Sequence, residues 1–184
     1  MCSRTLRRKI VARRAEARAA QLLADCGVFS PPVNVEQLVR QQGAMVSKSS
    51  FRDGDVSGML LRREGQSPVI GVNDSQPLLR QRFTIAHELG HLLLHPGREV
   101  VLDRPVRINL RDGLSSTATD REEIEANAFA ASLLMPADMV REQLMLLPVA
   151  IRQDPDRCTV ALAERFEVST SAMGFRLINL GLVS

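Results

Sequence analysis

Hydrophobic and polar residues follow a helical period in the first part of the chain and then switch to strand-like runs. Residues 5–26 are rich in alanine and arginine and predict a helix that ends near Gly27. Residues 35–42 predict a short second helix, with Asn34 in the N-cap position. Three strand-like runs follow, separated by two glycine turns: residues 44–48, 56–62 and 68–73, with Asp53-Gly54 and Glu64-Gly65 between them.

The helical period returns after the third strand-like run. A helix is expected from Pro77 to His95, with Asp74 or Ser75 as its N-cap and Pro96-Gly97 as its end. Since it follows a strand directly, we expect residues 69–72 of that strand to pair with an extended substrate. An ordinary internal strand is the alternative.

The second half of the chain predicts one long loop and further helices. Residues 96–120 hold few periodic apolar positions and predict a loop, either a lid over a cleft or a disordered segment. Residues 122–135 are rich in helix formers and end at Pro136. Residues 159–166 and 170–180 predict two helices joined by a three-residue turn, a helix-turn-helix-like pattern.

The helix that ends at His95 carries the sequence His87-Glu88-Leu89-Gly90-His91, which reads H-E-x-x-H. Residues four apart share one face of a helix, so the two imidazoles can bind a single metal ion. Glu88 lies beside them as the candidate general base of a zinc metalloprotease. The chain has only 3 histidines, all within nine residues of one another, which counts against a chance match.

A catalytic zinc usually takes three protein ligands, so one more is required. Glu125 is the best candidate, because it begins an apolar stripe on its helix and a carboxylate there needs a cation. Glu122, one turn earlier, is the second choice. His95 could also be a ligand, although packing near the helix C-terminus explains it better. The cysteines, a weaker possibility, are scattered: Cys2, Cys26 and Cys158.

Composition limits both the compartment and the chemistry. With 45% hydrophobic residues, 184 residues can bury a core, and three scattered cysteines predict no disulfide framework. Without a signal segment or an apolar run of 18 residues, the chain is expected to be cytoplasmic with no membrane partner. The chain has no Tyr, so zinc, Asn127, an arginine, a backbone N–H or His95 must stabilise an oxyanion.

The basic residues are concentrated at the N-terminus. Residues 1–18 contain seven basic residues and one acidic residue, whereas the remainder of the chain has a net charge of −3. Such an arm could contact nucleic acid, but a solvated helical face is the more common role. The second C-terminal helix offers only Arg176 and Asn179 to DNA, so packing or partner recognition is the favoured role there.

These motifs together resemble the ImmA/IrrE metallo-endopeptidases. The resemblance spans roughly residues 19–183, and its matching segments are residues 31–36, 82–95, 125–136, 168–169 and 176–182. It implies zinc ligands at His87, His91 and Glu125, a gluzincin-like site, and a catalytic glutamate at Glu88. It also implies a protein substrate, since family members cleave helix-turn-helix repressors and so derepress mobile elements or stress-response genes.

The expected fold is therefore α+β, a zincin-like metalloprotease with a small antiparallel or mixed sheet. We expect a basic helix over residues 1–30, a zinc peptidase domain over 31–150 and a helix-turn-helix-like segment over 151–184, packed on the peptidase. In the expected reaction, Glu88 takes a proton from the attacking water and delivers it to the leaving amine. The alternatives are a non-proteolytic zinc-containing regulator that binds a repressor or DNA, and a toxin–antitoxin component.

Overall fold

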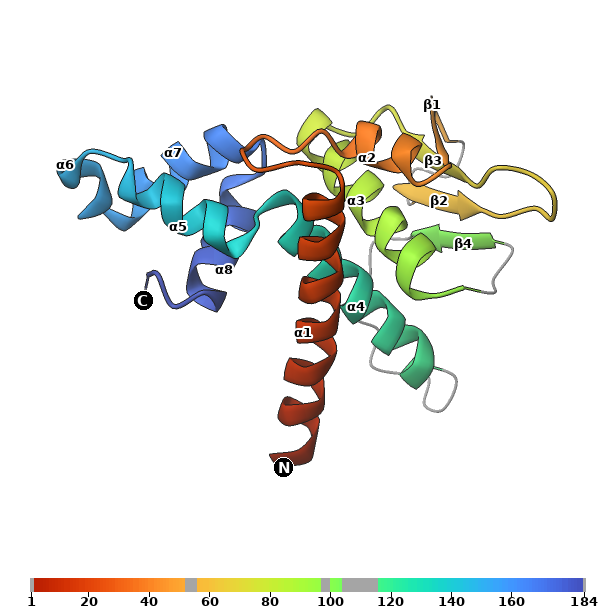
Figure 1. Cartoon of the computed structure of the whole chain (residues 1–184), viewed down its shortest axis with the longest axis horizontal. Helices are drawn as coiled ribbons and strands as arrows, with labels where there is room; N and C mark the ends of the chain where they lie inside the picture. The colour runs from red at the N-terminus through yellow and green to blue at the C-terminus, as the bar shows by residue number, and fades with distance from the viewer. Residues whose placement is uncertain (1, 52–55, 97–99, 104–115, 184) are drawn as a thin grey trace.

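The computed structural model describes residues 2–51, 56–96, 100–103 and 116–183. They form an α+β fold in which a small mixed sheet lies against one side of a largely helical body (Figure 1). The first two predicted helices are present as α1 (Cys2–Asp25) and α2 (Val35–Gln41). The Asn34 side chain accepts a hydrogen bond from the Gln37 N–H at 3.1 Å, which confirms it as the N-cap of α2.

The three strand-like runs form β1 (Met45–Ser49), β2 (Gly58–Leu61) and β3 (Val69–Asn73). The order in the sheet is β1-β3-β2-β4, with β1 parallel to β3 and β2 antiparallel to both of its neighbours. The expectation that residues 69–72 pair with a substrate is wrong, because β3 has a strand on each side. Its buried pattern is that of an internal strand.

The fourth strand and the start of the next helix both fall in the stretch predicted as a loop. β4 (Val100–Asp103) pairs antiparallel with β2, and α4 (Ser116–Leu134) begins well before residue 122. Sequence periodicity misses β4 because four residues are too few to show alternation. Residues 97–99 and 104–115, and with them most of the predicted lid, lie outside the described residues.

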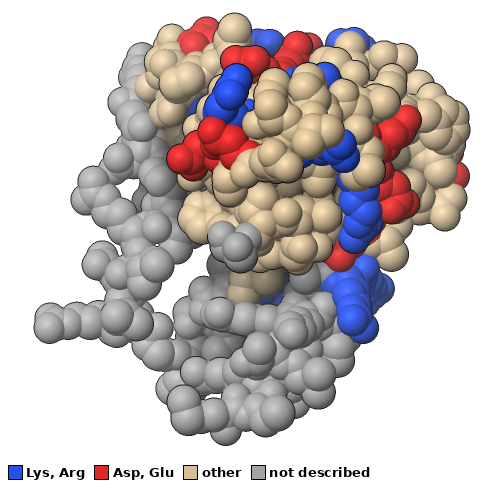
Figure 2. All heavy atoms as spheres, turned by 90° about the vertical axis from the view of Figure 1, so that its left-hand side faces the viewer, with Lys and Arg blue, Asp and Glu red and all other residues tan. Residues whose placement is uncertain are grey.

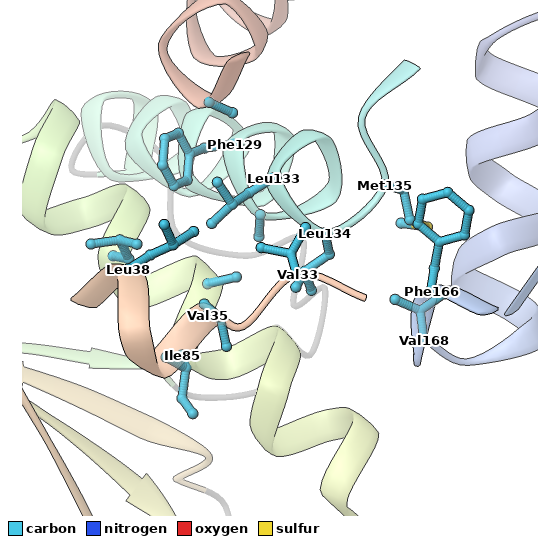
Figure 3. Packing of buried hydrophobic residues seen from close by; sticks show 14 of the residues in the cluster. Val33, Val35, Leu38, Ile85, Phe129, Leu133, Leu134, Met135, Phe166 and Val168 are labelled. Atoms are coloured by element: carbon cyan, nitrogen blue, oxygen red, sulfur yellow. The ribbon is translucent and has the colours of Figure 1, made fainter. Parts of the chain in front are cut away.

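The core forms where α4 passes between α1 and the helix α3 (Leu78–Leu94). Figure 3 shows Phe129, Leu133 and Leu134 of α4 packed with side chains of α2 and α3 such as Leu38 and Ile85, all of them fully buried or nearly so. A side chain of this size contributes about 1.5–3 kcal/mol when it is fully buried. The packing therefore fixes α3 against α4, and the candidate functional residues lie on these two helices.

The chain ends in four helices beyond Pro136: α5 (Ala137–Met145), α6 (Val149–Arg152), α7 (Pro155–Phe166) and α8 (Thr170–Asn179). The turn from α7 to α8 passes through Glu167, which has a positive φ of 51°. Phe166 and Val168 on either side of it pack against Met135 (Figure 3). None of the helices in the described part of the chain is long and apolar enough to cross a membrane.

Candidate metal centre

Helix α3 carries His87, Glu88 and His91, and all three side chains are buried. The helix begins at Leu78 with Pro77 as its N-cap, so the prediction of Asp74 or Ser75 as cap is wrong. Asn73 explains the difference, because its carboxamide oxygen accepts hydrogen bonds from the N–H and hydroxyl of Ser75 and holds that residue in a turn.

Helices α3 and α4 approach each other closely at Gly90. A Cβ at this position would lie 3.1 Å from Phe129 Cδ1 and 3.2 Å from Ala126 Cα. A glycine in the middle of a helix costs about 1 kcal/mol relative to alanine, so a steric reason is expected for it. Here the missing Cβ lets α4 pass close enough to present its own side chains to the histidines.

Three side chains bring their donor atoms together between the two helices. The Nε2 atoms of His87 and His91 lie 3.0 Å apart, Glu123 Oε2 lies 3.3 Å from His87 Nε2, and Glu123 Oε1 lies 3.2 Å from His91 Nε2. Zinc bonds of about 2.0–2.2 Å place neighbouring ligands of a tetrahedron roughly 3.3 Å apart. Each of the three distances is close to this edge length, with one carboxylate oxygen near each imidazole, and two imidazoles with one carboxylate are a donor set that zinc prefers.

The structure brings Glu123, and not the expected Glu125, to the two imidazoles. Glu125 points away from them, with its carboxylate 3.5 Å from His95 Nε2 and 3.2 Å from Arg121 Nε. Residues two apart on a helix are about 200° apart around its axis, so both carboxylates cannot face one site. Glu122, the second choice, is likewise outside the group of donor atoms that lie close together among the described residues.

Asn127 orients the first histidine. Its carboxamide oxygen lies 3.2 Å from His87 Nδ1, one helical turn beyond Glu123 on the same face of α4. A proton on Nδ1 donated to Asn127 leaves Nε2 free as a metal ligand. Asn127 was one of several candidates for stabilising an oxyanion, a role that needs its amide nitrogen as donor, and the atom that contacts His87 is its oxygen.

The spacing of Glu123 and Asn127 is the signal that sequence reasoning missed. A carboxylate and an amide four residues apart share one helix face, so a ligand and the group that orients another ligand can come from the same helix. The apolar stripe that begins at Glu125 faces the core instead, where Phe129 and Leu133 are fully buried.

Glu88 is fully buried, and strand β2 passes over it. A Cβ at Gly58 of β2 would overlap Thr84 Cγ2 and would lie 3.3 Å from Glu88 Oε1. The glycine therefore lets the strand pass directly over the candidate base. This contact restricts where the Glu88 carboxylate can lie.

Arg62, the residue after β2, binds the C-terminal end of α3. Its guanidinium donates to the carbonyl oxygens of His91 at 2.8 Å and His95 at 3.1 Å, which lie at the carbonyl end of α3. Burial lowers the pKa of Arg62, and the charge of Glu88 acts in the opposite direction. Arg62 thus places a cation near the candidate base and fixes the last turn of its helix.

Burial and neighbouring charges act in opposite directions on the titratable groups of the site. Burial alone would raise the pKa of Glu123, but hydrogen bonds from His87 and His91 and their charges hold it far below its usual range. For His95, burial and the charge of His91 lower the pKa, while Glu125 and Glu122 oppose this. An ionised carboxylate together with two imidazoles forms a suitable set of ligands for a divalent metal.

Comparison with known proteins points to a metallopeptidase family. The family described as the IrrE N-terminal-like domain matches residues 39–178. The radiation response metalloprotease IrrE of Deinococcus radiodurans is 32% identical over 111 residues, which cover 59% of this chain. This chain matches only about 30% of the length of that protein.

A solved structure shares the fold. It is described as a Mycobacterium tuberculosis transcriptional regulator, and the TM-score is 0.58 with 20% sequence identity. The similarity covers 89% of this chain and 55% of the other. At this identity the comparison supports the fold alone.

Proposed function

Because this chain belongs to the family of the IrrE N-terminal-like domain, the ImmA/IrrE metallopeptidases, we propose that it is a zinc-dependent endopeptidase. The observation that carries the proposal is the arrangement of His87 Nε2, His91 Nε2 and Glu123 at distances close to the edge length of a zinc tetrahedron, beside the buried Glu88. We assign these three residues as the metal ligands and Glu88 as the catalytic base.

The chemistry divides between the metal and the side chains. Zinc bound at this site supplies Lewis-acid chemistry, which lowers the pKa of water and polarises a peptide carbonyl. Glu88 accepts the proton of the attacking water and donates it to the leaving nitrogen. Asn127 keeps the His87 ring in the orientation that turns Nε2 toward the ligand group.

We further propose that the substrate main chain pairs with β4. Within the sheet as described, β4 has a strand partner on one side only, and it packs against α3. An edge strand offers unpaired N–H and C=O groups to an extended peptide. This replaces the internal strand β3 as the expected docking edge.

The proposed substrate is a helix-turn-helix repressor, whose cleavage derepresses a mobile-element or stress-response regulon in the cytoplasm. Support comes from the family resemblance of residues 82–95 and 125–136 and from the similarity to a radiation response metalloprotease. The rival proposal is a regulator that uses zinc as structure and binds a repressor or DNA without cutting it.

The test compares new protein N-termini in cells that carry the wild-type chain or Glu88→Gln. The substitution removes the base but keeps the shape of the side chain, so we expect zinc binding and folding to persist while cleavage falls at least 10²-fold. New termini in a repressor, seen with wild type only, would support the proposal. Identical termini in both strains, with zinc bound and the biological effect retained, would establish the rival.

A further inference from the structure

A groove lies between the start of α3, one face of α4, and helices α1 and α8. Its volume is about 1250 Å³. Small-molecule sites usually occupy about 300–1,000 Å³, so this groove is larger than a typical cofactor or metabolite site. Its size suits a segment of a protein.

The groove has an apolar floor and apolar edges. Ala128 and Ala131 of α4 lie on the floor, while Leu78 of α3 and Phe175 of α8 stand at the edges with 72% and 67% of their surface exposed. Large apolar side chains this exposed around one groove are characteristic of a surface that binds another protein. The occupant must therefore present an apolar stripe.

The charge of the groove is positive. Glu16 is its one acidic lining residue, and it is paired with Arg176 at 3.0 Å. Two further lining arginines remain, Arg13 on α1 and Arg80 on α3, and no ion pair involves either of them in the described part of the chain. A partner that carries carboxylates beside its apolar stripe would complement these two cations.

The elements that line the groove indicate the secondary structure of the segment that binds there. Every lining residue belongs to a helix or to the residues that lead into one, so the groove offers no strand edge to an extended chain. An occupant must satisfy its own backbone hydrogen bonds, as an α-helix does.

Two lining residues link the groove to the candidate metal centre. Phe83 lines it, and its ring stacks on the His87 ring with centroids 6.4 Å apart, while Ile124 lines it directly after the ligand Glu123. We propose that the groove binds an acidic amphipathic helix of the protein substrate and delivers the adjoining peptide to the metal. This inference rests on the proposed endopeptidase function and names the structural class of its substrate.

The test measures binding alone, on zinc-loaded Glu88→Gln protein, so it does not depend on cleavage. The probe is a fluorescent peptide of about 15 residues with leucines at helical spacing and glutamates beside them. Fluorescence anisotropy measures the affinity of this peptide for the Glu88→Gln protein and for the same protein with Phe175→Glu or with Ile178→Glu added. Ile178 is the matched control, because it lies on the same helix, is 57% exposed and does not line the groove.

We expect Phe175→Glu to weaken binding at least about tenfold and Ile178→Glu to leave it within about twofold. A peptide with lysines in place of glutamates should bind weakly to this protein and regain affinity for the Arg13→Glu, Arg80→Glu double variant. Equal binding by the two α8 variants, no saturable binding of the glutamate peptide, or a dimer that Phe175→Glu disrupts would overturn the proposal. Each of these results would leave a positive cleavage assay unaffected.

Discussion

At the scale of single residues, the choice of the third ligand depends on which side of its helix faces the cleft. Burial favours Glu125, whose side chain is 12% exposed, over Glu123 at 25%. A catalytic metal must be reached by substrate, however, so its ligands lie at the edge of a cleft and not within the core. Glu125 instead pairs with Arg121 and lies beside His95.

Zinc titration of two matched variants tests this assignment. Glu123→Gln removes the ligand charge and should weaken zinc binding by more than the roughly 10–100-fold that loss of an orienting group costs. Glu125→Gln should bind zinc with wild-type stoichiometry and nearly wild-type affinity. Both affinities are measured by competition with a chromophoric chelator.

The two glutamates are two residues apart on one helix, so each substitution serves as the control for the other. If Glu125→Gln lost zinc and Glu123→Gln kept it, the ligand expected from the family resemblance would be correct. The packing of α4 around Glu123 would then have to differ in the zinc-bound protein.

At the scale of elements, the seam between α3 and α4 determines whether the ligands meet. Gly90→Ala would gain up to about 1 kcal/mol of helix propensity but would press a methyl group against Ala126 and Phe129. Overpacking costs about 1–3 kcal/mol, and the Ala126 contacts are to backbone atoms that cannot rotate away. We therefore expect a net loss of about 1 kcal/mol in the free energy of unfolding and weaker zinc binding.

Gly174 of α8 provides the control. A Cβ there would lie 3.8 Å from Thr159 Cγ2, an ordinary contact, so Gly174→Ala should raise the unfolding free energy by up to about 1 kcal/mol and leave zinc binding unchanged. Denaturant unfolding and chelator competition measure both quantities. Gly90→Ala protein that is more stable than wild type and binds zinc equally well would contradict the steric argument.

Prediction from sequence succeeds for elements with a long, regular pattern. The helices of residues 5–26 and 35–42 and the three strand-like runs are all present within a few residues. Prediction from sequence fails where a tertiary contact determines whether an element forms or where it begins. β4 exists because β2 offers it an edge, and α3 starts at Leu78 because Asn73 binds Ser75. The two histidines follow from spacing alone, but their partner carboxylate depends on the rotation of α4 against α3.

At the scale of the whole molecule, α8 is tied to the rest of the protein by its one basic residue. Arg176 is buried, and its guanidinium donates to the Met135 carbonyl at 2.9 Å and pairs with Glu16 of α1 at 3.0 Å. Arg82 of α3 binds the turn between α7 and α8, where its guanidinium lies 3.2 Å from the Glu167 carboxylate. The same guanidinium donates to the Val33 carbonyl, before α2, at 3.0 Å.

Among the described residues, these contacts leave α8 with no basic side chain that faces solvent. Arg176 was the basic group that the second C-terminal helix could have offered to a phosphate, and it faces inward. Figure 2 shows acidic and basic side chains interspersed on the described part of this face, without the field of one sign that phosphate binding requires. The C-terminal helices are therefore better suited to packing and to the groove than to reading DNA.

Arg176→Met tests the internal role of this arginine. Methionine keeps much of the aliphatic stem but leaves the Met135 carbonyl without its donor, so the free energy of unfolding should fall by about 2 kcal/mol. For a chain of this size that corresponds to a fall in Tm of about 4–8 °C. Glu16→Gln should cost less, about 0–1 kcal/mol, because Glu16 is 42% exposed and its charge is already screened by water. A Tm unchanged by Arg176→Met, together with salt-dependent DNA binding that the same substitution removes, would instead make α8 a nucleic-acid contact.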